Sequence, residues 1–111
     1  MTFYSIRGVG RCLAASATLV FMSTSLAARA QEVTVGIDNF TFTPPGLTVK
    51  VGATVSWANH DDIPHTIVSA GKFKSKTLDT DNTFSFTFTS AGEYKYFCSL
   101  HPHMTGMIKV E

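Results

Sequence analysis

Apolar and polar residues alternate with a period of two along most of the chain after residue 30. The strongest run is Thr83 to Thr89, in which three phenylalanines alternate with serine and threonine. A period of two puts successive side chains on opposite faces of a β-strand, so one face packs inward and the other meets water. The same alternation recurs in Val33 to Ile37, Leu47 to Val51, Val55 to Trp57, Tyr94 to Cys98 and, more weakly, Met107 to Val110.

Residues typical of turns separate these runs at short intervals. They are Pro44-Pro45-Gly46, Val51-Gly52, Asn59 to Pro64, Ala70-Gly71, Asp79 to Asn82 and Ala91-Gly92. Short strands at this spacing favour a compact antiparallel structure. The chain is therefore predicted to be all-β, a Greek-key β-sandwich or barrel of about seven to eight strands. Its aromatic residues, including Trp57 and Phe97, are expected to pack the fold.

The first thirty residues have a different character from the rest. Arg7 and Arg11 precede an apolar run from Leu13 to Ala28, and Ala28-Arg29-Ala30 places small residues at alternate positions before Gln31. This is the pattern of a secretory signal peptide, and the run is shorter than the roughly 20 apolar residues that span a membrane. We expect residues 1–30 to be a signal peptide cleaved after Ala30, although a retained membrane anchor is the alternative.

Charge and cysteine content narrow the class of the remaining domain, residues 31–111. The whole chain has a formal charge of +1, but its three arginines all lie before residue 31. The domain keeps six lysines and eight acidic residues, a formal charge of −2, which gives no clustered positive field for nucleic acid or a membrane surface. It also keeps a single cysteine, Cys98, which cannot form an internal disulfide. An unpaired thiol in an oxidising compartment needs burial or a bound partner.

One short segment concentrates residues that can bind a metal. Tyr96 to Met104 contains a thiolate (Cys98), an imidazole (His101) and a thioether (Met104) within seven residues at the end of a predicted strand. His65, after Pro64, offers a fourth donor that a sandwich could bring close. Thiolate and thioether select soft ions, and two imidazoles and a thiolate with a weak axial methionine are typical of electron-transfer copper. Structural zinc sites more often contain paired cysteines or further histidines.

With these residues in view, the sequence resembles the cupredoxins, most closely the amicyanin and plastocyanin-like group. The resemblance covers nearly all of residues 33–110. The residues that carry it are Phe42-Thr43-Pro44, Leu47-Thr48-Val49-Lys50-Val51-Gly52, Val55-Ser56-Trp57-Ala58-Asn59, Pro64-His65-Thr66 and Tyr96-Phe97-Cys98. The spacing of two residues between Cys98 and His101, and again between His101 and Met104, is similar to the short amicyanin loop.

The resemblance implies that His65, Cys98 and His101 bind one copper ion in a plane, with Met104 as the long axial ligand. Thr66 stands where many members of the family have asparagine, so the hydrogen bonds around the ligands are expected to be rearranged. The backbone N–H of residue 66 is still expected to reach the Cys98 sulfur. His103 lies at a loop position that is commonly apolar.

The expected function is single-electron transfer between transient redox partners by a monomeric periplasmic protein that is not an enzyme. The exposed edge of His101 would be the electron port by family resemblance. A copper-delivery protein of the same fold is the alternative, and neither a thiol enzyme nor a purely structural module explains the ligand spacing as well. Several other residues are expected to have ordinary roles: His60 and His103 as solvated loop residues, Met107 as a core residue, and Lys72, Lys74 and Lys76 as protection of a strand edge.

Overall fold

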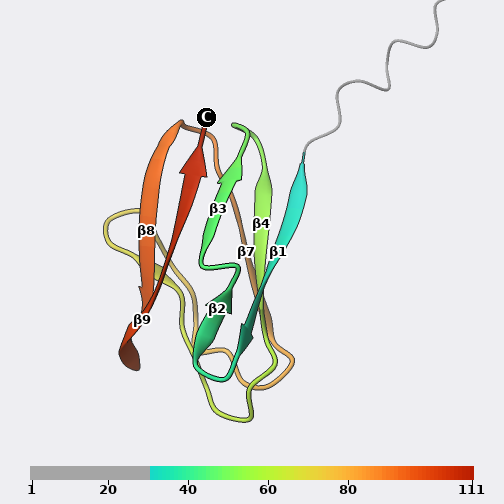
Figure 1. The fold of residues 1–111 in the computed structure, drawn as a ribbon, viewed down its shortest axis with the longest axis vertical. Helices are drawn as coiled ribbons and strands as arrows, with labels where there is room; N and C mark the ends of the chain where they lie inside the picture. Colours follow the sequence, from blue (N-terminus) through green and yellow to red (C-terminus); the bar gives the residue numbers. More distant parts are fainter. Residues whose placement is uncertain (1–30) are drawn as a thin grey trace, which may run out of the picture.

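The computed structural model describes residues 31–111, which form two β-sheets packed face to face (Figure 1). The expected signal peptide, residues 1–30, lies outside the described residues. The strands are β1 (Glu32–Asp38), β2 (Thr41–Thr43), β3 (Gly46–Val49), β4 (Thr54–Asn59), β5 (Val68–Ser69), β6 (Phe73–Lys74), β7 (Thr83–Thr87), β8 (Gly92–Cys98) and β9 (His101–Val110). The predicted all-β sandwich is confirmed, and no stretch of residues 31–111 forms a helix that could cross a membrane.

The first sheet has the order β2-β1-β4-β7 and the second β3-β9-β8-β5-β6. Most neighbours are antiparallel, but β1 pairs with β4 and β3 pairs with β9 in parallel, so both sheets are mixed. The described part of the chain has nine strands where the sequence predicted seven or eight. The strands outside the six alternating runs are β2, β5 and β6, which have only two or three residues and are too short to produce an alternating pattern.

The core lies between the sheets and consists of the side chains that the alternation placed on inner faces. Val35 and Ile37 on β1, Val55 and Trp57 on β4, and Ile108 on β9 are fully buried. The three phenylalanines of the Thr83 to Thr89 run also join this core, with Phe88 fully buried and the other two half-buried. The period of two therefore predicted both the strands and the face that each one buries.

Val51 and Phe97, which the sequence predicts to be buried, are not. Val51 is half-exposed because β3 ends at Val49 and the chain turns through Gly52, whose φ is +95°. Phe97 is only half-buried, because it follows Tyr96 on β8 and so faces the outside of the sheet. The expectation for the lysines is confirmed, since β6 is an edge strand and Lys72, Lys74 and Lys76 are exposed around it.

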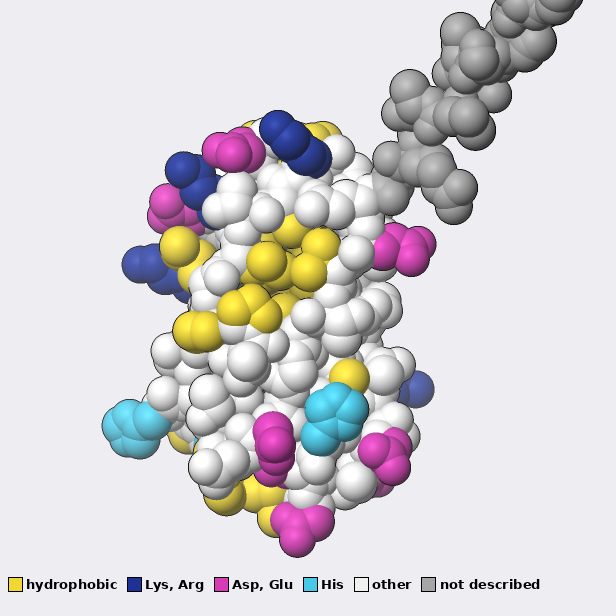
Figure 2. Space-filling view, turned by 45° about the vertical axis from the view of Figure 1, so that its right-hand side comes forward, with side chains coloured by type: hydrophobic (Ala, Val, Ile, Leu, Met, Phe, Trp, Pro, Cys, Tyr) yellow, Lys and Arg dark blue, Asp and Glu magenta, His cyan; other side chains and the backbone are white. Residues whose placement is uncertain are grey.

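The turn between β8 and β9 lies at the lower end of the sandwich in Figure 1. Figure 2 shows histidine side chains toward this end and lysines mainly toward the other end, while acidic side chains lie at both ends. The fold thus presents the segment around Cys98 and His101 at one tip of the molecule, next to the loop that joins β1 and β2.

Candidate metal centre

Three of the four predicted ligands converge at this tip of the sandwich. His65, Cys98 and His101 each offer one ligand atom, and these atoms lie within 4.8 Å of one another. The Cys98 Sγ is 3.7 Å from His65 Nδ1 and 3.6 Å from His101 Nδ1. Side chains that are 33 residues apart in sequence therefore face a common point.

The two segments reach this point by different routes. Cys98 is the last residue of β8 and pairs directly with His101, the first residue of β9, across a tight turn. The segment expected to be a ligand loop is therefore mostly strand from His101 onward. His65 precedes β5 and forms an isolated bridge with Leu78, in which each backbone N–H donates to the other residue's carbonyl at 3.1 and 2.8 Å.

Asp61 orients the imidazole of His65. Its Oδ2 lies 2.7 Å from His65 Nε2, and both side chains are buried. A carboxylate only accepts hydrogen bonds, so Nε2 carries the proton and Nδ1 presents its lone pair toward Cys98 and His101. The sequence analysis did not single out Asp61, although its position four residues before His65 in a polar turn was a usable signal.

The Asp61 carboxylate is itself held in its ionised form. Burial alone would raise its pKa, but hydrogen bonds from the Phe40 and Asn39 backbone N–H groups and from His65 lower the pKa from 3.8 to about 2. A permanently charged acceptor fixes the tautomer of His65.

The Cys98 sulfur is buried and accepts a hydrogen bond from the Thr66 backbone N–H at 3.3 Å, as expected from the sequence. The Thr66 hydroxyl lies 3.7 Å from the same sulfur. Burial would raise the pKa of the thiol, but the Thr66 N–H and the contacts with His65 and His101 lower it from 9.0 to about 6. Near neutral pH the thiolate, which is the form that binds metals, is thus favoured.

Thr66 also ties the two ligand segments together. Its hydroxyl oxygen accepts a hydrogen bond from the Ser99 backbone N–H at 2.8 Å and lies 2.8 Å from the Ser99 hydroxyl. Thr66, which directly follows His65, is therefore bonded to Ser99, which directly follows Cys98.

His101 and Met104 face the outer side of the site. His101 is half-buried, Met104 is 5% exposed, and both line a shallow depression together with Phe40, Leu100, Pro102 and His103. Phe40 was not singled out from the sequence, yet its ring packs edge-to-face on both imidazoles, with centroids 5.1 Å from His101 and 5.7 Å from His65.

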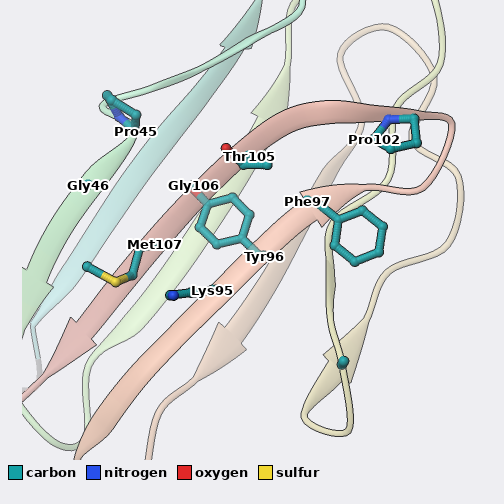
Figure 3. Close-up of a pocket in the computed structure, with 10 residues that line it drawn as sticks. Pro45, Gly46, Lys95, Tyr96, Phe97, Pro102, Thr105, Gly106 and Met107 are labelled. Carbon is teal, nitrogen blue, oxygen red and sulfur yellow. The ribbon is translucent and has the colours of Figure 1, made fainter.

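The remaining histidines, His60 and His103, are exposed as expected. His103, however, lies on β9 and not in a loop, and it lines the same depression as His101 and Met104. Met107 is half-buried rather than in the core, because it faces outward from β9 into a separate groove with Lys95, Phe97 and Thr105 (Figure 3). None of the three converging ligand residues lines that groove.

The converging side chains suit a single soft ion. Nitrogen and sulfur donors at about 2.0 and 2.3 Å from one ion, spread by roughly 115°, would lie about 3.6 Å apart. The observed separations of 3.6 and 3.7 Å match this value. A thiolate with two imidazoles and a nearby buried thioether is also the set that copper prefers.

Comparison with known proteins agrees with the fold and the site. A family model described as a cupredoxin-like domain matches residues 11–110. The chain belongs to the cupredoxin family. This cupredoxin is 38% identical over 88 residues to amicyanin from Paracoccus versutus, a match covering 74% of this chain and 67% of that protein.

Two further comparisons place the cupredoxin among amicyanins and plastocyanins. It is 33% identical over 103 residues to chloroplastic plastocyanin from Tetradesmus obliquus, covering 79% of this chain and 70% of that protein. The solved structure of an amicyanin variant in the Cu(I) form aligns with a TM-score of 0.70 and 34% identity, covering 77% of this chain and 88% of that one. The resemblance seen in the sequence motifs is thereby confirmed.

Proposed function

We propose that this cupredoxin is a type 1 blue-copper electron carrier that holds one copper ion with His65, Cys98, His101 and Met104. The observation that carries the proposal is the convergence of a favoured thiolate and two imidazole nitrogens within 4.8 Å. The copper-containing amicyanin structure supports the choice of metal. When bound, copper would supply the one-electron step between Cu(I) and Cu(II).

The protein's part in electron transfer is to hold the ligands still. His65 is fixed by Asp61, Cys98 by the Thr66 N–H, and the two segments by the bonds between Thr66 and Ser99. These bonds exist among the protein's own groups, so the donor positions do not depend on the charge of the metal. A fixed set of donors keeps structural change small when an electron arrives or leaves, and hydrogen bonds to the sulfur tune the potential.

The surface around His101 suits brief contact with redox partners. Phe40 and Leu100 are two of the three large hydrophobic side chains that are exposed in residues 31–111, with 52% and 49% of their areas accessible. A small apolar surface at the ligand edge fits the small, transient interfaces of electron-transfer proteins. We therefore assign the electron port to this surface and place the protein among monomeric carriers rather than enzymes.

We also propose that residues 1–30 are a signal peptide cleaved after Ala30, and that residues 31–111 act in the periplasm. The composition of the first thirty residues supports this, and β1 begins at Glu32, immediately after the expected cleavage point. Mass spectrometry of protein recovered from the periplasm tests it, and a chain that starts at Met1 would contradict it.

Copper loading of the purified protein tests the function. We expect an intense visible absorption from sulfur-to-copper charge transfer, lost in Cys98→Ser, and repeated reduction and oxidation with the copper retained. A wild-type protein that stays colourless would refute the copper site. Release of the ion on each reduction would instead identify a copper-delivery protein and refute electron transfer.

A further inference from the structure

The turn between β1 and β2 adopts a backbone conformation that its second residue, Phe40, disfavours. Asn39 and Phe40 have φ values of +52° and +56°. Asp38 pairs with Thr41, so these two residues form a two-residue hairpin turn. Such turns need positive φ at both positions and favour Asn-Gly, whereas a bulky side chain at positive φ is an outlier. Phe40 thus occupies a position where glycine would fit with less strain.

Asp61 holds this turn in place. Its Oδ1 accepts the Asn39 N–H at 2.6 Å and its Oδ2 accepts the Phe40 N–H at 3.0 Å. The same Oδ2 accepts the hydrogen bond from His65 Nε2. Asp61 is anchored in turn, because its own N–H donates to the Asn59 side chain at 2.9 Å. One buried carboxylate therefore couples the strained turn to the first histidine ligand.

The turn delivers an aromatic ring to the open side of the site. The Phe40 ring lies edge-on to His65 and His101, whose own centroids are 5.0 Å apart. The ring gains little from burial, since it is 52% exposed. Strain at functional sites persists when surrounding contacts enforce it, as the hydrogen bonds from the Asn39 and Phe40 N–H groups to Asp61 do here. A smaller residue would relieve both the backbone strain and the exposure of an apolar ring. Neither local stability nor burial therefore explains the position of the ring, and we look for its role at the site.

We propose that Phe40 is a positioning residue whose ring forms a wall over the metal centre. This wall shields the two imidazoles from solvent and limits access to the buried Cys98 sulfur. This inference rests on the proposed copper function for its importance, but the wall itself is a property of the protein alone. It also makes the β1–β2 turn part of the site, although none of its residues is a ligand.

The decisive variant is Phe40→Gly, which removes the wall and relieves the turn together. Val51→Ala is the matched control, because Val51 is an apolar residue about as exposed as Phe40, at 50%. Its backbone N–H donates to the Glu111 carbonyl, which is not part of the site. Phe40→Leu is the rescue variant, because leucine restores bulk without an aromatic ring.

Two rates measure the protection that the Phe40 wall gives, one in the metal-free protein and one in the copper-loaded protein. The first is alkylation of Cys98 by iodoacetamide in the metal-free protein, and the second is removal of copper by a soluble Cu(I) chelator from the reduced, loaded protein. We expect Phe40→Gly to raise both rates about tenfold or more, Phe40→Leu to recover most of the protection, and Val51→Ala to stay within about twofold of wild type.

The thermal midpoint of the metal-free variants separates a wall from ordinary packing. Phe40→Gly is expected to melt at or above the wild-type temperature, because the turn suits glycine. A lower midpoint would make Phe40 a packing residue and overturn the proposal, as would wild-type alkylation and release rates in Phe40→Gly. A wild-type protein that binds no copper would refute the proposed function, while the alkylation rates would still decide for or against the wall.

Discussion

Gly106→Ala offers a sharp test of how tightly the core between the two sheets is packed. Gly106 on β9 pairs with Tyr96 on β8, and Figure 3 shows the tyrosine ring beside the glycine. A Cβ at position 106 would lie 2.3 Å from both Cζ and Oη of Tyr96 and 2.8 Å from its Cε2. Carbon atoms in contact normally lie about 3.5–4.0 Å apart. The added methyl group therefore requires the ring to move.

The Tyr96 ring has little room to move. It is 2% exposed, and its centroid lies 4.8 Å from that of Phe42 and 5.3 Å from that of Trp57. Overpacking a core costs typically 1–3 kcal/mol, and a clash with a ring confined by two others belongs in the upper half of that range, about 2–3 kcal/mol. For a domain of this size each kcal/mol lowers the melting temperature by about 4–8 °C. We expect a fall of about 10–20 °C.

Thermal and urea unfolding of the metal-free protein, followed by circular dichroism, measures this loss. Gly46→Ala on the adjacent strand β3 is the matched control, because a Cβ there meets no atom within 4 Å. The control is expected to keep or slightly raise stability by reducing the freedom of the unfolded chain. If the two variants differ by less than about 0.5 kcal/mol, the reasoning from the confined ring is refuted.

Three other substitutions test the hydrogen bonds and surface of the site. Thr66→Val removes the hydroxyl bonds to Ser99 but keeps the backbone N–H, so we expect a loss of about 1–2 kcal/mol in the free energy of unfolding and a shifted charge-transfer band. Thr66→Ser is expected to stay close to wild type. An unshifted band in Thr66→Val would contradict the role of the hydroxyl. Asn59→Leu removes three hydrogen bonds between a buried side chain and the backbone of Ile63, Leu78 and Asp61, so we expect it to cost about 3 kcal/mol or more in urea unfolding. A loss below about 1 kcal/mol would count against this reasoning. Leu100→Asp is expected to slow electron exchange in stopped-flow measurements while leaving the visible absorption intact, and unchanged exchange rates would exclude a port at this surface.

The fold could be predicted where the sequence alternates strongly. In β4, Val55 and Trp57 are buried and their neighbours are not, because a strand with one inner face imposes that pattern directly. The two parallel pairings could not be predicted, since alternation defines the faces of a strand but not its neighbours or their direction. Val51 was misjudged because an apolar residue in phase with a strand looks the same whether or not the strand continues.

The site could be predicted in part for a similar reason. Cys98 and His101 lie close in sequence, so their convergence follows from one tight turn. The approach of His65 was inferred from the family pattern, because tertiary contacts alone bring it there. Asp61 was missed because its partners depend on loop conformation. Phe40 was missed because sequence rules argue against phenylalanine at positive φ, and the contacts that enforce it are long-range.

The position of β9 between β3 and β8 has a consequence for how the molecule is assembled. β9 is the bridge of the five-stranded sheet, and its parallel partner β3 lies 61 residues earlier in the chain, since Gly46 pairs with Met107. Closing such a long loop must precede the contacts that repay its entropy, which makes folding slow compared with helical proteins of equal size. The second sheet therefore cannot be completed until β9 has been synthesised, and loss of residues 107–110 would leave β3 without its neighbour.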